Sequence, residues 1–251
     1  MKADVPYDYD AIWRRAYGDM QEIGPVHRHM RRLCSRLLQD LDYDSVLDIG
    51  CGAGHNMALL CEGREVTVAG VDISPEALGR ARRLWPEGSF TELDIQADRL
   101  DQPRDLVFSS LVLEHLPDDE AALRNMRAMT ERYLLVTTIA GDFERYRTWE
   151  EQMGHVRNYA RGELEHKLEG AGFTPVRVIY WGFPLYSPVG RTLQRGMTSE
   201  AEFGFGKRIL AHVMNGLYFL NSSRRGDLVV ALARVDGGGP VKAVGRQDQG
   251  A

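Results

Sequence analysis

The sequence has little of what disulfide-stapled, secreted or membrane-spanning proteins need. Three cysteines occur in 251 residues, Cys34, Cys51 and Cys61, and their spacing matches neither a disulfide framework nor a zinc site. No uninterrupted apolar run approaches the roughly 18 residues that cross a membrane. The first ten residues, MKADVPYDYD, are too polar and acidic for a secretory signal. We therefore expect a cytoplasmic protein with reduced cysteines, no stable membrane insertion and no bound metal.

An excess of positive charge is missing as well. The formal net charge is −5 at pH 7, whereas proteins that bind nucleic acids usually carry a basic surface. The acidic balance therefore favours a small-molecule partner over a nucleic acid. Hydrophobic residues make up 43% of the chain, which is enough for a full core. The length allows one large α/β domain with or without an appended cap.

Short apolar runs alternate with helical patterns from residue 45 onward. We expect strands at residues 45–50, 66–73, 89–95, 105–111, 133–140, 176–181 and 228–235. We expect helices at residues 55–61, after the N-cap Ser74, at 118–130 and at 161–171. This alternation predicts a mostly parallel sheet with helices on both faces.

Three segments lie outside the predicted core, which covers residues 41–182 and a final strand at 227–235. Residues 1–40 are expected to form a helical lid. Residues 183–226 are far more than a hairpin needs, and their aromatic side chains suit a substrate cap or a homodimer surface. Attachment of this segment to a membrane surface is an alternative. The glycine-rich tail, 236–251, is expected to be disordered.

A glycine-rich loop follows the first predicted strand, in VLDIGCGAG at residues 46–54. Gly50 and Gly52 allow a sharp turn and a close approach of the backbone to a ligand. A dinucleotide loop would read G-x-G-x-x-G, but His55 stands three residues after Gly52, which argues against a nicotinamide dehydrogenase. Asp48 precedes the glycines, and an acid there suits an ammonium group better than a pyrophosphate.

Carboxylates end the next two predicted strands. Asp72, followed by Ile73, stands where an acidic side chain can accept both hydroxyls of a ribose. Asp94 could accept from an adenine amino group, while the amide of Ile95 could face a ring nitrogen. These residues together describe a ligand with an ammonium group, a ribose and an adenine but no phosphate. S-adenosylmethionine fits that description.

The motifs LDIGCGAG, VDIS, the acidic end of the third strand and FSSLVLEHLPDDE resemble, in order and spacing, class I S-adenosylmethionine-dependent methyltransferases of the small-molecule type. The resemblance covers roughly residues 40–180. It implies a Rossmann-like three-layer fold whose seventh strand is antiparallel and lies between the fifth and sixth. It also implies that Gly50 and Gly52 line the methionine moiety, Asp72 holds the ribose, Asp94 faces the adenine, and Ser110 and Leu111 lie beside the cofactor.

Candidates for the acceptor side lie on loops and in the outer segments. His155 in MGHVRNY follows the fifth strand, on a loop that opens at the cofactor edge, and is the candidate general base or substrate ligand. A histidine that only holds a backbone carbonyl is the alternative. Its neighbours Arg157 and Tyr159 are candidate substrate contacts.

Three further residues complete the candidate set. His115 in LEHLP is a candidate substrate contact, although this motif usually serves structure in similar sequences. Tyr17 lies in the predicted lid and could close over the cofactor. Tyr186 lies in the predicted cap and could contact the substrate.

These observations predict methyl transfer to a small-molecule acceptor, with S-adenosylhomocysteine as the second product. We expect O-methylation of a hydroxyl on a sugar or natural-product scaffold, assisted by a base. Transfer to nitrogen or carbon is one alternative. A protein that binds S-adenosylmethionine without methylating is another.

Overall fold

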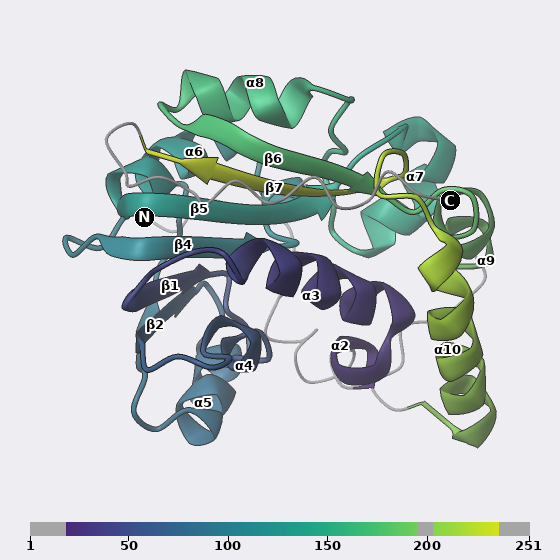
Figure 1. The fold of residues 1–251 in the computed structure, drawn as a ribbon, viewed down its shortest axis with the longest axis horizontal. Helices are drawn as coiled ribbons and strands as arrows, with labels where there is room; N and C mark the ends of the chain where they lie inside the picture. The colour runs from purple at the N-terminus through teal and green to yellow at the C-terminus, as the bar shows by residue number, and fades with distance from the viewer. Residues whose placement is uncertain (1–18, 195–202, 236–251) are drawn as a thin grey trace.

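The computed structural model describes residues 19–194 and 203–235 (Figure 1). The candidate lid residue Tyr17 and the tail 236–251, which the sequence predicts to be disordered, lie outside the described residues.

A seven-stranded sheet forms the centre of the molecule. Its strands are β1 (Ser45–Ile49), β2 (Thr67–Asp72), β3 (Ser89–Glu92), β4 (Arg104–Ser110), β5 (Thr130–Ile139), β6 (Thr174–Trp181) and β7 (Leu228–Arg234). The order across the sheet is β3-β2-β1-β4-β5-β7-β6, and β7 runs antiparallel to both of its neighbours. The predicted Rossmann-like fold, with an antiparallel last strand between the fifth and sixth, is confirmed.

The sheet buries an apolar layer on each face because its strands alternate. In β5, Tyr133 and Leu135 belong to one buried cluster and Leu134 and Val136 to the other. The helices α3 (Pro25–Leu38), α4 (Met57–Leu60) and α5 (Pro75–Leu84) lie on one face of the sheet in Figure 1. The other face carries α6 (Asp119–Ala128) and α8 (Glu163–Gly170).

Local signals in the sequence fix several helix boundaries. Ser74 caps α5 by accepting a hydrogen bond of 3.1 Å from the Ala77 amide, with Pro75 in the first turn. Asp118 caps α6 in the same way, at 2.8 Å from the Ala121 amide. These predicted starting points are confirmed.

One helix was not predicted from the sequence. Helix α7 (Phe143–Gln152) follows β5, where the sequence analysis expected only a loop. Asp142 caps it, accepting from the Arg145 amide at 3.3 Å. Its residues FERYRTWEEQ are mostly charged, and Tyr146 and Glu150 are its buried members, so it lacks the apolar stripe that identifies a surface helix. Its last turn brings Glu150 close to the loop that carries His155.

The predicted lid and cap pack against each other in the described residues. The cap contains the π-helical turn η2 (Tyr186–Gly190), α9 (Arg191–Gln194), α10 (Phe205–Leu217) and the 3₁₀ turn η3 (Tyr218–Leu220), and the N-terminal part contains α2 (Asp19–Ile23) and α3. His29 of α3 joins them: its Nε2 lies 2.9 Å from the Asn215 carbonyl oxygen. Its ring stacks on Trp181 with centroids 5.1 Å apart.

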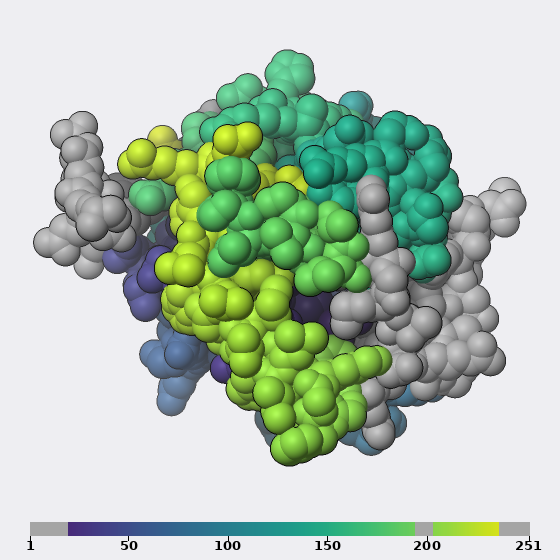
Figure 2. Space-filling view, turned by 90° about the vertical axis from the view of Figure 1, so that its right-hand side faces the viewer, coloured from purple at the N-terminus to yellow at the C-terminus, as the bar shows by residue number. Residues whose placement is uncertain are grey.

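Helix α10 presents an apolar face to the surface. Phe205 is 82% exposed, and Ile209, Val213 and Leu217 are also exposed. Leu220 of the following turn η3 is 71% exposed. Figure 2, which looks at the right-hand side of Figure 1, shows this helix in yellow-green at the front of the molecule. No helix among the described residues is long and apolar enough to cross a membrane. A homodimer through residues 183–226 stays a prediction.

Candidate active site

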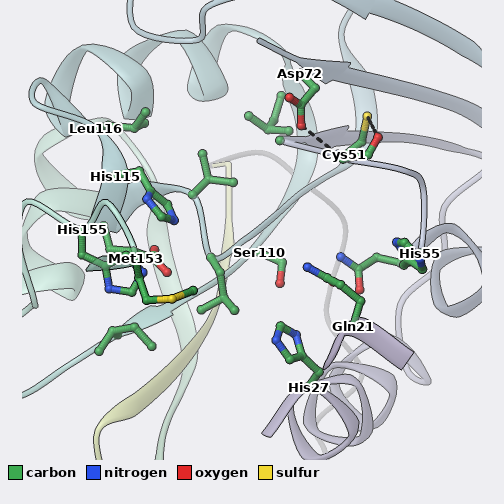
Figure 3. Close-up of a pocket in the computed structure, with 18 of the residues that line it drawn as sticks. Gln21, His27, Cys51, His55, Asp72, Ser110, His115, Leu116, Met153 and His155 are labelled. Atoms are coloured by element: carbon green, nitrogen blue, oxygen red, sulfur yellow. Dashed lines mark hydrogen bonds between the residues drawn. The ribbon is translucent and has the colours of Figure 1, made fainter. Parts of the chain in front are cut away.

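A cavity of about 250 Å³ opens at the carboxyl ends of the parallel strands. It is lined by these residues that the sequence analysis selected: Gly50, Gly52, Asp72, Ile73, Asp94, Ile95, Ser110, Leu111, His115, His155 and Tyr186. Figure 3 shows His115 and His155 on one side of the cavity and Gln21, His27 and His55 on the other. Asp48, Arg157 and Tyr159 do not line it.

Gly50 and Gly52 stand where the loop needs a backbone conformation that favours glycine. Gly50 and Gly52 have φ values of +68° and +53°, a region that side chains strongly disfavour. A Cβ on Gly50 would lie 2.3 Å from Cγ2 of Val112. The amide of Gly52 donates to Asp72 Oδ2 at 2.8 Å, which ties the loop to the end of β2. The backbone therefore forms a bare wall against which a ligand can lie closely.

Asp72 is positioned by two backbone amides. Its Oδ1 accepts from Ser74 at 2.9 Å and its Oδ2 from Gly52, and the residue is 9% exposed. The side chain lines the cavity at the end of β2. Its role as a ribose ligand stays a prediction.

One carboxylate oxygen of Asp94 has no hydrogen-bond donor among the described residues. Its Oδ1 accepts from the Gln96 amide at 3.0 Å. Its Oδ2 is buried and has no hydrogen-bond partner among the described residues. A buried acceptor without a donor costs about 1–3 kcal/mol, so a ligand amino group would be favourable there. The cavity thus fits the adenosyl part of the expected cofactor. We call Gly50, Gly52, Asp72 and Asp94 the glycine-loop wall.

Asp48 lies behind this wall. It is fully buried, and neither of its oxygens has a partner in the described part of the chain. Burial raises its pKa well above the ordinary value, and the nearby charge of Asp72 raises it further. Asp48 does not line the cavity in this structure. Its predicted contact with an ammonium group stays a prediction.

The end of β4 is strained where it meets the cavity. Leu111 has a φ of +57°, unusual for any residue with a side chain. Its amide donates to the Thr137 carbonyl oxygen at 2.9 Å, which holds it in place. Ser110 accepts from the Thr137 hydroxyl at 3.0 Å. The fold thus keeps both residues directed along the cavity edge.

His155 is held by a buried carboxylate that the sequence analysis missed. Its Nδ1 lies 2.6 Å from Oε2 of Glu150, which is 1% exposed. The other oxygen of Glu150 accepts from Asn158 at 3.0 Å and forms a buried ion pair with Arg191 of the cap. Arg191 also pairs with Asp227 at 2.9 Å. A chain of charges therefore connects the cap to His155.

This contact determines the form of the imidazole. Burial lowers the pKa of His155, and the charge of Glu114 opposes that shift. The lowered pKa favours the neutral ring, and the neutral tautomer that fits the contact with Glu150 carries its proton on Nδ1. Its Nε2 keeps the lone pair. Glu150 could not be assigned from the sequence because its partner depends on where α7 ends.

His115 and Glu114 lie against His155. The two imidazole rings meet edge to face, with centroids 4.6 Å apart. His115 Nδ1 lies 3.1 Å from the Gly154 carbonyl oxygen, and burial together with the nearby His155 lowers the pKa of His115 to about 3. Glu114 Oε2 accepts from Thr138 at 2.7 Å, while its Oε1 is buried without a partner among the described residues.

One ligand-type atom from each of Glu114, His115 and His155 lies within 4.8 Å of the other two. The sequence analysis expected no such metal-type cluster. It missed this one because about 40 residues separate its two parts along the chain. We call these three residues the histidine wall.

Arg157 and Tyr159 contact the buried carboxylate of Asp119 and do not line the cavity. Tyr159 is fully buried and donates to Asp119 Oδ2 at 2.7 Å. Arg157 pairs with Asp119 Oδ1 and donates to the Pro117 carbonyl oxygen. Asp119 is itself buried and needs these partners. Both residues thus join the loop to Asp119 at the start of α6, and neither lines the cavity. Their predicted contact with the substrate stays a prediction.

The remaining wall of the cavity, which we call the N-terminal wall, mixes polar with apolar side chains. Its polar members Gln21, His27, His55 and Asn56 were not chosen from the sequence as site residues, and Met20, Val26 and Met30 lie beside them. Burial, followed by the charge of Arg31, lowers the pKa of His27 to about 4. No arginine or lysine lines the cavity within residues 19–194 and 203–235. Tyr186 closes the cap side, with its ring stacked on Trp181 at 5.6 Å.

Comparisons with known proteins agree with this architecture. A trans-aconitate 2-methyltransferase from Azoarcus sp. (strain BH72) is 30% identical over 174 residues, which cover 68% of this chain. The match spans 66% of that relative, just under two thirds of its length.

Two solved structures share the fold at 17% identity. A methyltransferase from Haloferax volcanii, in complex with the Trm112 methyltransferase activator, superposes with a TM-score of 0.62 over 91% of this chain and 97% of that one. Magnesium protoporphyrin IX methyltransferase from Synechocystis PCC 6803, with bound S-adenosylhomocysteine, gives 0.55 over 86% and 87%.

The family model of the methyltransferase domain matches residues 24–178, more than half of the chain. The chain therefore belongs to the methyltransferase-domain family and is a class I S-adenosylmethionine-dependent methyltransferase.

Proposed function

We propose that this enzyme methylates a hydroxyl oxygen of a small-molecule acceptor, such as a sugar or natural-product scaffold. The observation that carries the proposal is the hydrogen bond between His155 and buried Glu150, in the same cavity as Asp72 and Asp94. A hydroxyl needs a base during methyl transfer, and a neutral imidazole fixed by a carboxylate is suited to that task.

The glycine-loop wall would hold the cofactor. Asp72 would accept the ribose hydroxyls, and Asp94 Oδ2 would accept from the adenine amino group. Gly50 and Gly52 would lie against the methionine part, while Ile73, Ile95, Ser110 and Leu111 would border it. Bound in this way, S-adenosylmethionine supplies an electrophilic methyl group on its sulfonium.

The histidine wall would receive the acceptor, with His115 and Tyr186 beside it. The acceptor oxygen forms a bond to the methyl carbon, the bond from that carbon to sulfur breaks, and S-adenosylhomocysteine leaves. His155 Nε2 takes the hydroxyl proton. Glu150 keeps Nδ1 protonated beforehand and stabilises the imidazolium afterwards, and Arg191 balances the charge of Glu150.

A tricarboxylate acceptor of the kind named for the Azoarcus relative is less well supported. A carboxylate nucleophile needs no base, and recognition of several carboxylates usually uses arginine or lysine. The described residues that line this cavity include neither. An amine acceptor with a free lone pair needs no base either, so it would not explain why Glu150 holds His155 in this cavity.

Product analysis tests this proposal. The purified enzyme would be supplied with S-adenosylmethionine and a panel of sugars, phenols, amines and trans-aconitate, and S-adenosylhomocysteine would be measured. We expect turnover with a hydroxyl compound and a methyl ether in the product by NMR. Turnover confined to trans-aconitate, with a methyl ester as product, or N-methylation alone, would overturn it.

A further inference from the structure

We infer that Glu114, His115 and His155 form a binding site for a divalent transition-metal ion such as Zn²⁺, and that the bound ion blocks methyl transfer. The binding itself is independent of the proposed function. The blocking effect rests on it, because the ion would occupy the nitrogen that we assign to the base.

The spacing of the three side chains suits a small cation. Their ligand-type atoms lie within 4.8 Å of one another, and they come from the 3₁₀ turn η1 (Leu113–His115) and the loop after α7. Ligands around a tetrahedral zinc lie about 3.4 Å apart, as bond lengths near 2.0–2.1 Å require. Side-chain movements of about 1 Å would therefore close the site.

Both imidazoles have one ring nitrogen fixed by an oxygen of the protein. His115 gives its Nδ1 to the Gly154 carbonyl oxygen, and His155 gives its Nδ1 to Glu150. For His155, a proton on Nδ1 leaves the lone pair on Nε2. Figure 3 shows the two imidazoles on the same side of the cavity. Metal-binding histidines almost always donate their other ring nitrogen to a carboxylate or carbonyl in this way.

Glu114 supplies the charge. It is fully buried, and its Oε2 is fixed by the hydroxyl of Thr138 at 2.7 Å. Its Oε1 is buried without a hydrogen-bond partner in the part of the chain that the structure describes. A buried carboxylate oxygen without a donor is unfavourable, and a cation would compensate it. Glu114 also lines the cavity, so the oxygen is not sealed off from a ligand.

The donor set selects the class of ion. Two imidazoles and one carboxylate suit Zn²⁺, Co²⁺ or Ni²⁺, whereas Mg²⁺ and Ca²⁺ prefer oxygen ligands throughout. Three protein ligands leave one position of a tetrahedral ion open toward the cavity. The ion would take the lone pair of His155 Nε2, so that nitrogen could no longer accept a proton from an acceptor. The metal-free enzyme is therefore the active form.

Direct metal binding tests the first half of the inference. Protein stripped with a chelator would be titrated with Co²⁺, followed by visible absorption, and with Zn²⁺, followed by calorimetry, without cofactor or acceptor. We expect one ion per chain and at least a tenfold loss of affinity in His115→Ala and in Glu114→Gln. The control His212→Ala, an exposed histidine on α10, should bind normally. Absence of stoichiometric binding, or unchanged affinity in the folded His115→Ala variant, would overturn the site.

Turnover with and without Zn²⁺ tests the second half. We expect inhibition that tracks the measured occupancy and is reversed by EDTA. Loss of activity in EDTA would instead overturn the blocking role, as would full activity of the metal-loaded enzyme. The His155→Ala variant, assayed without metal, separates this result from a failure of the proposed base: near-normal turnover there refutes the base, whatever the binding data show.

Discussion

The two walls of the cavity differ in how far apart their residues lie along the chain. The glycine-loop wall is built at the ends of neighbouring strands, and its groups are held largely by backbone amides. The histidine wall joins η1 to the loop after α7, and its partner Glu150 is held in turn by Arg191 of the cap. A binding surface made by strand ends can be recognised as a motif, whereas a wall assembled over long separations becomes visible only in the fold.

Removing the proposed base should have the largest effect on turnover. It should change the histidine wall and leave cofactor binding at the glycine-loop wall intact. We expect His155→Ala to lower kcat by about a hundredfold or more, the range typical for loss of a general base. Affinity for S-adenosylhomocysteine should hardly change, because His155 lies away from Asp72 and Asp94. Steady-state kinetics and calorimetry would measure both quantities, with His212→Ala as the control. A near-normal kcat in His155→Ala would mean that the acceptor needs no base.

A substitution in the glycine-loop wall should weaken cofactor binding. Asp72→Asn should weaken binding of S-adenosylhomocysteine by about ten- to hundredfold, or roughly 1.5–3 kcal/mol, because a charged acceptor for the ribose is lost. Calorimetry would measure it, and replacement of the exposed acid Asp101 by asparagine provides a control for charge. Unchanged affinity with an intact fold would show that the ribose lies elsewhere.

The link between cap and base can be weakened without removing either. Arg191→Lys keeps a positive charge but cannot contact Glu150 and Asp227 together. We expect kcat to fall by about tenfold while KM for the cofactor stays constant, since Glu150 would hold His155 less firmly. In the His155→Ala background the same substitution should have little further effect on kcat. Equal losses in both backgrounds would indicate a purely structural role for Arg191.

The smallest predicted effect concerns His27 and the stability of the protein at low pH. The pKa of His27 is about 4 in the folded protein, against about 6.5 for an unperturbed histidine, so the unfolded chain binds more protons between these values. The free energy of unfolding should therefore fall as the pH drops below about 6.5. His27 would account for at most about 2 kcal/mol at pH 5.

Denaturant titrations at pH 7.5 and pH 5 would measure this. His27→Gln, which cannot gain a proton, should show a smaller decrease in stability than the wild type. An identical decrease in both proteins would mean that His27 is protonated freely in the folded state.

The sequence predicted what depends on neighbouring residues. The apolar runs identified all seven strands, the Ser74 cap was correct, and the glycines that require positive φ stood in a recognisable loop. Helix α7 was not predicted because its surface is charged and its buried side chains are Tyr146 and Glu150. The contacts of Arg157 and Tyr159 with buried Asp119 could not be predicted because they depend on the fold.

The central claim is that one cavity holds the cofactor along the glycine loop and the acceptor against the histidines. An experimental structure with S-adenosylhomocysteine tests it most directly. We predict the ribose hydroxyls within about 3 Å of Asp72, the adenine amino group at Asp94 Oδ2, and the sulfur turned toward His155. A ligand whose adenine lies among Gln21, His27 and His55, with its sulfur away from His155, would contradict the account.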